Sequence, residues 1–117
     1  VTEIGNEAFK NCSNLTSITL PNSVTRIGRY AFGYCSNLTS ITLPKNVTSI
    51  EGNAFCGCKN LTSITLPNSV TSIGWCAFTG CWKLTTINID NTKAYVDANW
   101  DSSWKGDCPA NVNYLRT

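Results

Sequence analysis

The sequence repeats with a period of 23 residues. Three residue types recur at this spacing: Leu15, Leu38, Leu61 and Leu84; Phe9, Phe32, Phe55 and Phe78; and Cys12, Cys35, Cys58 and Cys81. Segments 15–37 and 61–83 are identical at 16 of 23 positions. Self-similarity at such a period is typical of a solenoid, in which each repeat makes one coil and stacks on its neighbours.

The period divides the chain into two parts. Residues 1–14 are the second half of a repeat, segments 15–37, 38–60 and 61–83 are full repeats, and Leu84 opens a fourth that decays after Ile89. We therefore expect repeats over 1–89 and a capping segment over 90–117. In that segment we expect Trp100, Trp104 and Tyr114 to form a lid over the last coil, because large aromatic side chains are usually buried. The alternation over 110–115 predicts a final strand.

Each repeat begins with a strand pattern. Leu15, Ile18 and Leu20 are its apolar positions, and β-branched residues between them favour a pleated strand. Pro21 ends the strand because proline cannot donate to the next rung. An extended stretch with inward Val24 and Ile27 follows.

The rest of the repeat predicts a helix of one or two turns. Gly28 permits a tight bend before it. Ala31, Phe32 and Cys35 then follow at helical spacing, on one face. One repeat cannot bury this apolar stripe alone, so stability must come from stacking.

The repeat pattern L-x-x-I-x-L-P-x-x-V-x-x-I-G-x-x-A-F-x-x-C-x-x resembles the BspA-like leucine-rich repeat family. The resemblance covers Val1 to about Ile89, and one framework position departs, where segment 38–60 reads Ile50-Glu51-Gly52 and its glycine is displaced by one. It implies an α/β repeat solenoid with a right-handed coil, a short-stranded parallel sheet on one face and short helices on the other. It also implies a secreted or cell-surface protein that acts in adhesion, with a protein or glycan of a host or neighbouring cell as partner.

Composition favours binding over catalysis. The 117 residues contain no His, which excludes Ser-His-Asp and Cys-His arrangements and His-ligated metal sites. Asp90, Asp97, Asp101 and Asp107 gather near the C-terminus without a paired-carboxylate pattern, so we expect no enzyme and no cofactor. A net charge of +2 indicates neither nucleic-acid nor membrane-surface binding, and no apolar run could span a bilayer.

The seven cysteines predict a buried ladder and one disulfide. Cys12, Cys35, Cys58 and Cys81 fall on the inward face as small core residues. Strung along the axis, one per coil, they cannot surround one metal ion. Cys56 and Cys76 share a face in adjacent repeats, and we expect them to bridge two coils. Cys108 either pairs with Cys81 or stays free.

The first strand of each repeat carries a regular polar surface. The candidate ligand face comprises Ser17, Thr19, Ser40, Thr42, Ser63, Thr65, Thr86 and Asn88. Strand residues alternate sides, so these should form an uncharged, hydroxylated ledge of roughly 240 Å². It is either a solvated strand face that resists aggregation or a ligand surface. A standard protein interface needs about 800 Å² per partner, so the ledge suits a weak contact, a glycan or one section of a longer surface.

The N-terminal end predicts a further contact. Val1 enters in mid-repeat and would leave the first coil uncovered. We expect either that the chain is the C-terminal end of a longer array or that a partner covers this face in a head-to-tail assembly. The leading hypothesis is a non-catalytic binding module at the cell surface or secreted. The alternatives are a self-assembling solenoid element and ice binding through the Ser/Thr ladder.

Overall fold

The computed structural model describes residues 2–117, and Val1, where the first half-repeat was expected to begin, lies outside them. One side of each coil adds a two-residue strand to a parallel sheet of four: β1 (Glu3–Ile4), β3 (Arg26–Ile27), β5 (Ser49–Ile50) and β7 (Ser72–Ile73). Each residue pairs with the one 23 positions later, as Ile4 does with Ile27. These strands come from the V-x-x-I segment, so the parallel strands occupy two sides of the coil and not one.

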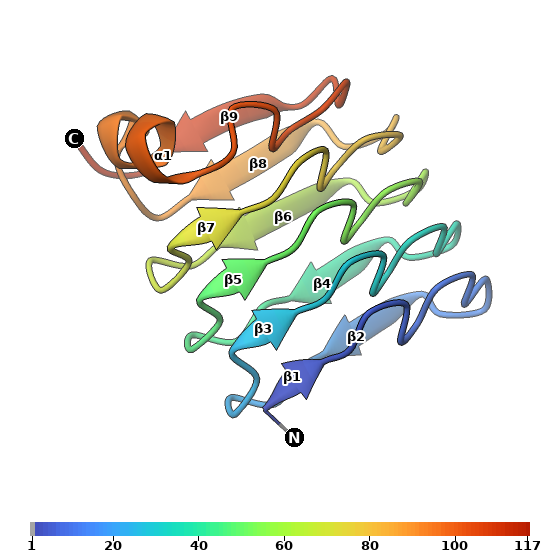
Figure 1. Ribbon diagram of the computed structural model, residues 1–117. Coiled ribbons are helices and arrows are strands. Elements are labelled where there is room, and N and C mark those ends of the chain that lie inside the picture. The colour runs from blue at the N-terminus through green and yellow to red at the C-terminus, as the bar shows by residue number, and fades with distance from the viewer. Residues whose placement is uncertain (1) are drawn as a thin grey trace.

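The second set of strands carries the predicted ledge. It consists of β2 (Ser17–Thr19), β4 (Ser40–Thr42), β6 (Ser63–Leu66), β8 (Thr86–Ile89) and β9 (Asn111–Tyr114). All pairings are parallel, but the set is divided into a β2–β4 pair and a β6–β8–β9 sheet. Figure 1 shows both sets rising in steps from the N-terminus, with the C-terminal helix beside the last strands.

The segments expected to form short helices are turns instead. In the second coil, Tyr30 and Tyr34 both have positive φ, at 54° and 59°. Backbone N–H groups alternate between two targets: Gly33 donates to the Tyr30 carbonyl, whereas Phe32 donates to the Ala54 carbonyl of the next coil. A helix would keep all these bonds within one coil. In the stacked coils, backbone N–H groups such as that of Phe32 bond to a carbonyl of the next coil instead. The inward side chains therefore recur at the spacing of a helix although the segment is not a helix.

The core runs along the axis of the solenoid. Phe9, Phe32, Phe55 and Phe78 stack with ring centroids 5.2–5.4 Å apart and planes within 4° of parallel. The last three are fully buried. No charged or polar residue is buried among residues 2–117. Phe32, Phe55 and Phe78 each lie between two other aromatic rings, so the aromatic surface of these coils is covered by their neighbours.

The C-terminal residues 90–117 contain a helix and pack against the last coils. Helix α1 (Lys93–Asn99) begins at Thr92, whose hydroxyl accepts a hydrogen bond from the Tyr95 N–H. It is the one α-helix among the described residues, and no helix there is long and apolar enough to cross a membrane. Trp104 then packs edge-on against Phe78, with centroids 6.0 Å apart.

The chain closes with the strand that its alternation predicted. β9 pairs with β8, and the paired residues are 25 positions apart, as Ile87 and Val112 are. The α1 insertion lengthens this coil beyond 23 residues. Trp100 and Trp104 are buried and Tyr114 is half-buried, so all three expected aromatic residues contact the core.

Candidate functional site

The ledge consists of two parallel rows of polar side chains. The first row runs through Ser17, Ser40, Ser63, Thr86 and Asn111, and the second through Thr19, Thr42, Thr65, Asn88 and Asn113. Between the rows, Ile41, Ile64 and Ile87 are buried, whereas Ile18 on β2 and Val112 on β9 are partly buried. Alternation therefore separates the polar and core faces as the sequence pattern indicated. Every predicted ledge residue lies on one of these strands.

Asn111 and Asn113 also belong to the ledge, although the 23-residue period does not point to them. They lie on β9, in register with Thr86 and Asn88, and the Asn113 side chain donates to the Asn88 amide oxygen at 3.1 Å. The available signal was the alternation of Asn111–Tyr114, which resembles that of β8. The 25-residue offset hid it from a count at period 23.

A hollow interrupts the ledge between β4 and β6. The Thr62 N–H lies 3.5 Å from the Thr39 carbonyl oxygen, whereas the equivalent bond one coil earlier, from Thr39 to Thr16, measures 2.9 Å. The opening, about 340 Å³, is lined by Ser40, Ile41, Thr42, Leu43, Ser63, Ile64, Thr65 and Pro67. Polar and apolar residues of the two strands therefore line the same space. The ledge is two patches around a shallow hollow, not the unbroken plane that the ice-binding alternative requires.

The ledge rows contain no ionisable side chain. Just after β8 and β9, Asp90 pairs with Arg116, whose Nε atom lies 2.7 Å from Asp90 Oδ1. The hydrogen bond from Arg116 holds the pKa of the Asp90 carboxyl below its ordinary value. Such a neutral polar surface offers hydrogen-bonding groups and shape, with little electrostatic steering of a charged molecule.

The aspartates near the C-terminus have structural partners. Asp97 accepts from the Lys93 ammonium at 2.7 Å within α1. Asp101 accepts from the Ser103 N–H, and Asp107 accepts from the Gly80 N–H. These contacts fix the C-terminal segment. Among residues 2–117, no three His, Cys, Asp or Glu side chains converge as metal ligands would.

The cysteine ladder lies along the core. Cys35, Cys58 and Cys81 are fully buried and Cys12, in the first coil, is half-buried. Each buried thiol donates at 3.1 Å to the phenylalanine carbonyl of the coil before, as Cys58 does to Phe32. Cys108 extends the row, because its sulfur lies 3.8 Å from the Cys81 carbonyl oxygen.

The burial of this row affects its acidity. Desolvation raises the pKa of the Cys35 and Cys108 thiols. The pKa of Cys81 is raised by its side-chain hydrogen bond with Cys58 and by burial. Thiols held neutral are poor nucleophiles, which agrees with a packing role.

The expected bridge between Cys56 and Cys76 is absent from the structure, which has all seven cysteines as free thiols. The two residues occupy different environments. Cys56 is buried and shares a hydrogen bond with the Tyr34 hydroxyl, and burial raises its pKa. Cys76 is half-buried at a positive-φ turn position. The prediction assumed that both cysteines lie on one face of a helix. The two segments are turns, so this spacing does not bring the two sulfur atoms together.

The comparisons with known proteins agree with the repeat architecture. A family model described as the BspA type leucine rich repeat region matches residues 1–100, in six copies. A leucine-rich repeat protein from Bacteroides ovatus ATCC 8483 is similar over 98% of this chain, with 30% identity and a TM-score of 0.82. This chain covers 28% of that protein's chain.

Two further solved structures are similar. A leucine-rich repeat protein from Bacteroides capillosus ATCC 29799 is 38% identical over 78% of this chain and 64% of its own, with a TM-score of 0.71. A leucine rich cell surface protein from Faecalibacterium prausnitzii A2-165 is 37% identical over 76% of this chain and 29% of its own, with a TM-score of 0.66. No curated protein matches the chain.

Proposed function

The chain belongs to the BspA-type leucine-rich repeat family, and we propose that it is a non-catalytic module that binds a protein partner through its ledge, in a secreted or cell-surface setting. Leucine-rich repeat solenoids are typical binding scaffolds, and one similar protein is described as a cell surface protein. The observation that carries the proposal is the pair of polar rows on five strands, in register within β2–β4 and within β6–β8–β9, with the apolar side chains between the rows turned toward the core.

The size of the ledge limits the affinity. Five strands spaced about 4.8 Å apart, each three residues wide at about 3.3 Å per residue, present roughly 240 Å². That is well below the ~800 Å² per partner of a standard interface. The module therefore binds weakly as a single copy, and works by repetition, either along a longer solenoid or through many copies on a surface.

The test uses multivalent display. A fluorescent tetramer of the chain is applied to arrays of extracellular proteins and of glycans. The double variant Ser63→Arg/Thr65→Arg places two cations at the hollow on β6, and we expect it to lower the protein-array signal at least tenfold. Ala98→Arg, on the exposed surface of α1, adds charge away from the ledge and is the matched control.

Two results would contradict this proposal. Binding that survives in the double variant would place the contact surface elsewhere. Binding confined to the glycan array would replace a protein partner with a carbohydrate.

The first coil supports a second candidate, a self-assembling solenoid. Phe9, Cys12, Leu15 and Ile18 pack against the core but are only partly buried, unlike their equivalents in later coils. A second copy of the chain placed against this coil would cover them and extend both sets of strands. Heterologous contacts of this kind form open assemblies.

A further inference from the structure

Trp75 is exposed beside a built hollow that is separate from the ledge. Its side chain is 59% exposed, although a buried indole would stabilise the fold. The equivalent positions in other coils are Arg29 and Gly52, so the repeat does not require an aromatic residue here. The hollow, about 390 Å³, also takes Thr79, Ser102, Ser103, Lys105 and Asp107 as lining side chains.

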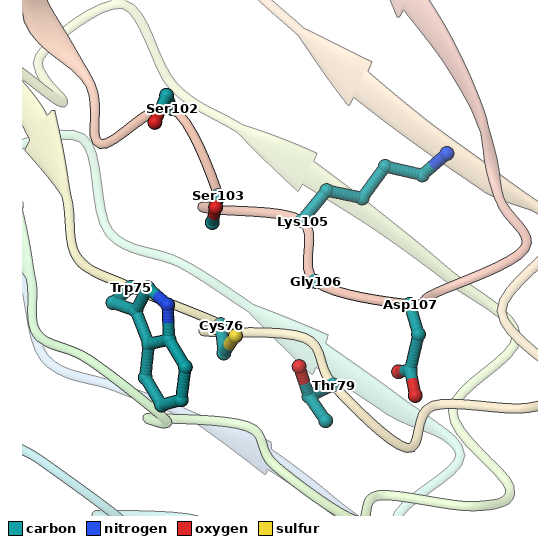
Figure 2. A pocket seen from close by; sticks show the side chains of 8 residues that line it. All are labelled: Trp75, Cys76, Thr79, Ser102, Ser103, Lys105, Gly106 and Asp107. Atoms are coloured by element: carbon teal, nitrogen blue, oxygen red, sulfur yellow. The ribbon is translucent and has the colours of Figure 1, made fainter.

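Two segments form the walls of this Trp75 hollow. Figure 2 shows Trp75, Cys76 and Thr79 on the turn of the last repeat, and Ser102 to Asp107 on the facing run of the C-terminal segment. The Cys76 N–H donates to the Ser103 carbonyl at 2.8 Å and joins the walls. The backbone carbonyl of Trp75 accepts a hydrogen bond from the Asn53 N–H at 3.0 Å, which fixes the backbone at Trp75.

The polar wall is held in place before any ligand arrives. The Gly80 N–H donates to Asp107 Oδ1 at 3.1 Å, which leaves Oδ2 available as an acceptor. Gly106 has a φ of +63°, and a Cβ there would collide with the Thr79 hydroxyl, so this run approaches the turn closely. The Ser103 N–H donates to Asp101 Oδ1, which fixes the start of the run. Such preorganisation lowers the entropy lost on binding.

The chemistry of the lining selects one class of ligand. An exposed indole face attracts the C–H face of a saturated, partly apolar ring, and the opposite wall carries the hydroxyl groups of Ser102 and Ser103 and the carboxylate of Asp107, while the Lys105 side chain extends away from Trp75 (Figure 2). Lys105 and Asp107 cancel in charge, which favours a neutral ligand. A pyranose has one C–H face and a rim of hydroxyls. We propose that the Trp75 hollow binds a neutral hexopyranose at the end of a glycan.

A second exposed tryptophan provides a matched comparison. Trp82 is 58% exposed, beside Lys59 and Lys83 in a hollow of about 420 Å³ that has no acidic residue in its lining. It equals Trp75 in exposure but lacks a carboxylate acceptor, and its positive surroundings do not favour a neutral sugar. Replacing either tryptophan removes one exposed indole and leaves the core intact.

The experiment is saturation-transfer NMR on the full chain. The probes are methyl β-galactopyranoside, methyl β-glucopyranoside and methyl α-mannopyranoside, each tested separately. We expect ring-proton signals from at least one sugar, a reduction of at least fivefold in Trp75→Ala, and unchanged signals in Trp82→Ala. Asp107→Asn keeps the Oδ1 acceptor for Gly80 and should weaken binding about threefold, because a neutral amide replaces a charged acceptor.

Three results would overturn the proposal: no signal from any of the three sugars, equal losses in the two tryptophan variants, or full binding by Trp75→Ala. Thermal unfolding midpoints of the variants should match the parent, since both tryptophans are exposed. The Ser63→Arg/Thr65→Arg variant should keep its sugar signals. A failure of the ledge proposal and a failure of this one are therefore distinguishable.

Discussion

At the residue scale, the glycines that follow β3 and β7 allow neighbouring coils to approach closely. A Cβ on Gly74 would lie 2.5 Å from the Gly52 nitrogen, and one on Gly28 would lie 2.6 Å from the Asn6 nitrogen. Neither glycine has the positive φ that would mark a strained bend. The tight bend expected at Gly28 is therefore, in the structure, a close contact between backbones of adjacent coils.

The glycine displaced to position 52 is accommodated at this same place. Glu51 takes the framework position, and its carboxylate accepts a hydrogen bond from Arg26 Nε at 3.2 Å. The fold is unchanged there, because β5 keeps its register with β3 and β7. The irregular repeat replaces a packing glycine with a partly exposed ion pair.

Gly74→Ala should therefore destabilise the solenoid. The added methyl group meets backbone atoms that cannot rotate away, and overpacking of this kind costs about 1–3 kcal/mol. Urea unfolding followed by circular dichroism measures the loss. Gly5→Ala is the control, because a Cβ at Gly5 has no atom within 4 Å. Equal stability of the two variants would contradict the close-contact interpretation.

At the scale of the element, the stacked phenylalanines join the turn segments. Phe55 lies between Phe32 and Phe78 with centroids 5.4 Å from each. Phe9 has one ring neighbour and is only partly buried. The ring of each coil covers those above and below it, so the energetic importance of a phenylalanine depends on its position in the stack.

We expect Phe55→Ala to lower the free energy of unfolding by about 3–5 kcal/mol, the usual cost of such a core truncation. Phe9→Ala should cost less than half as much, because less surface is lost and no closed cavity forms. The same urea titration compares them. If Phe55→Ala does not fold, Phe55→Leu provides the comparison with Phe9→Leu. Equal losses at the two positions would show that the stack does not bury its middle members more strongly than its end.

At the scale of the whole molecule, the two ends of the solenoid differ. Trp104 contacts Phe78 edge-on, Trp100 packs against Trp104, and β9 pairs with β8 at the C-terminal end. At the other end, the apolar residues Phe9 and Leu15 remain partly exposed. The self-assembly candidate would act through these partly exposed apolar residues of the first coil.

Sedimentation velocity over a concentration series tests that candidate. We expect the sedimentation coefficient of the parent chain to rise with concentration, and Leu15→Lys to prevent the rise by placing a charge on the uncovered coil. Leu115→Lys, at an exposed leucine of the C-terminal segment, is the charge control.

A disulfide between two chains could also raise the sedimentation coefficient, since half-buried Cys12 lies on the same coil. Repeating the series with reductant tests this cause. If reductant or Cys12→Ser abolishes the association, disulfide cross-linking is responsible. A strict monomer at every concentration would remove the self-assembly candidate.

The sequence alone predicts the period of 23, the alternation at Ile18 and Ile41, and the inward Phe and Cys positions. It can do so because each copy of the repeat buries the same positions. The ledge followed from the same alternation. Spacing alone did not distinguish a helix from turns whose N–H groups bond to the next coil, since both turn every third or fourth side chain inward.

Several features depend on contacts between coils and appear only in the tertiary structure. These are the second parallel sheet, the division of the ledge between β4 and β6, the joining of Asn111 and Asn113 to it, and the free thiols of Cys56 and Cys76. The Trp75 hollow is of the same kind, because its walls are 23 or more residues apart in sequence and meet where Cys76 bonds to Ser103. A repeat determines what one coil buries, whereas the packing of unlike coils decides where the surface opens.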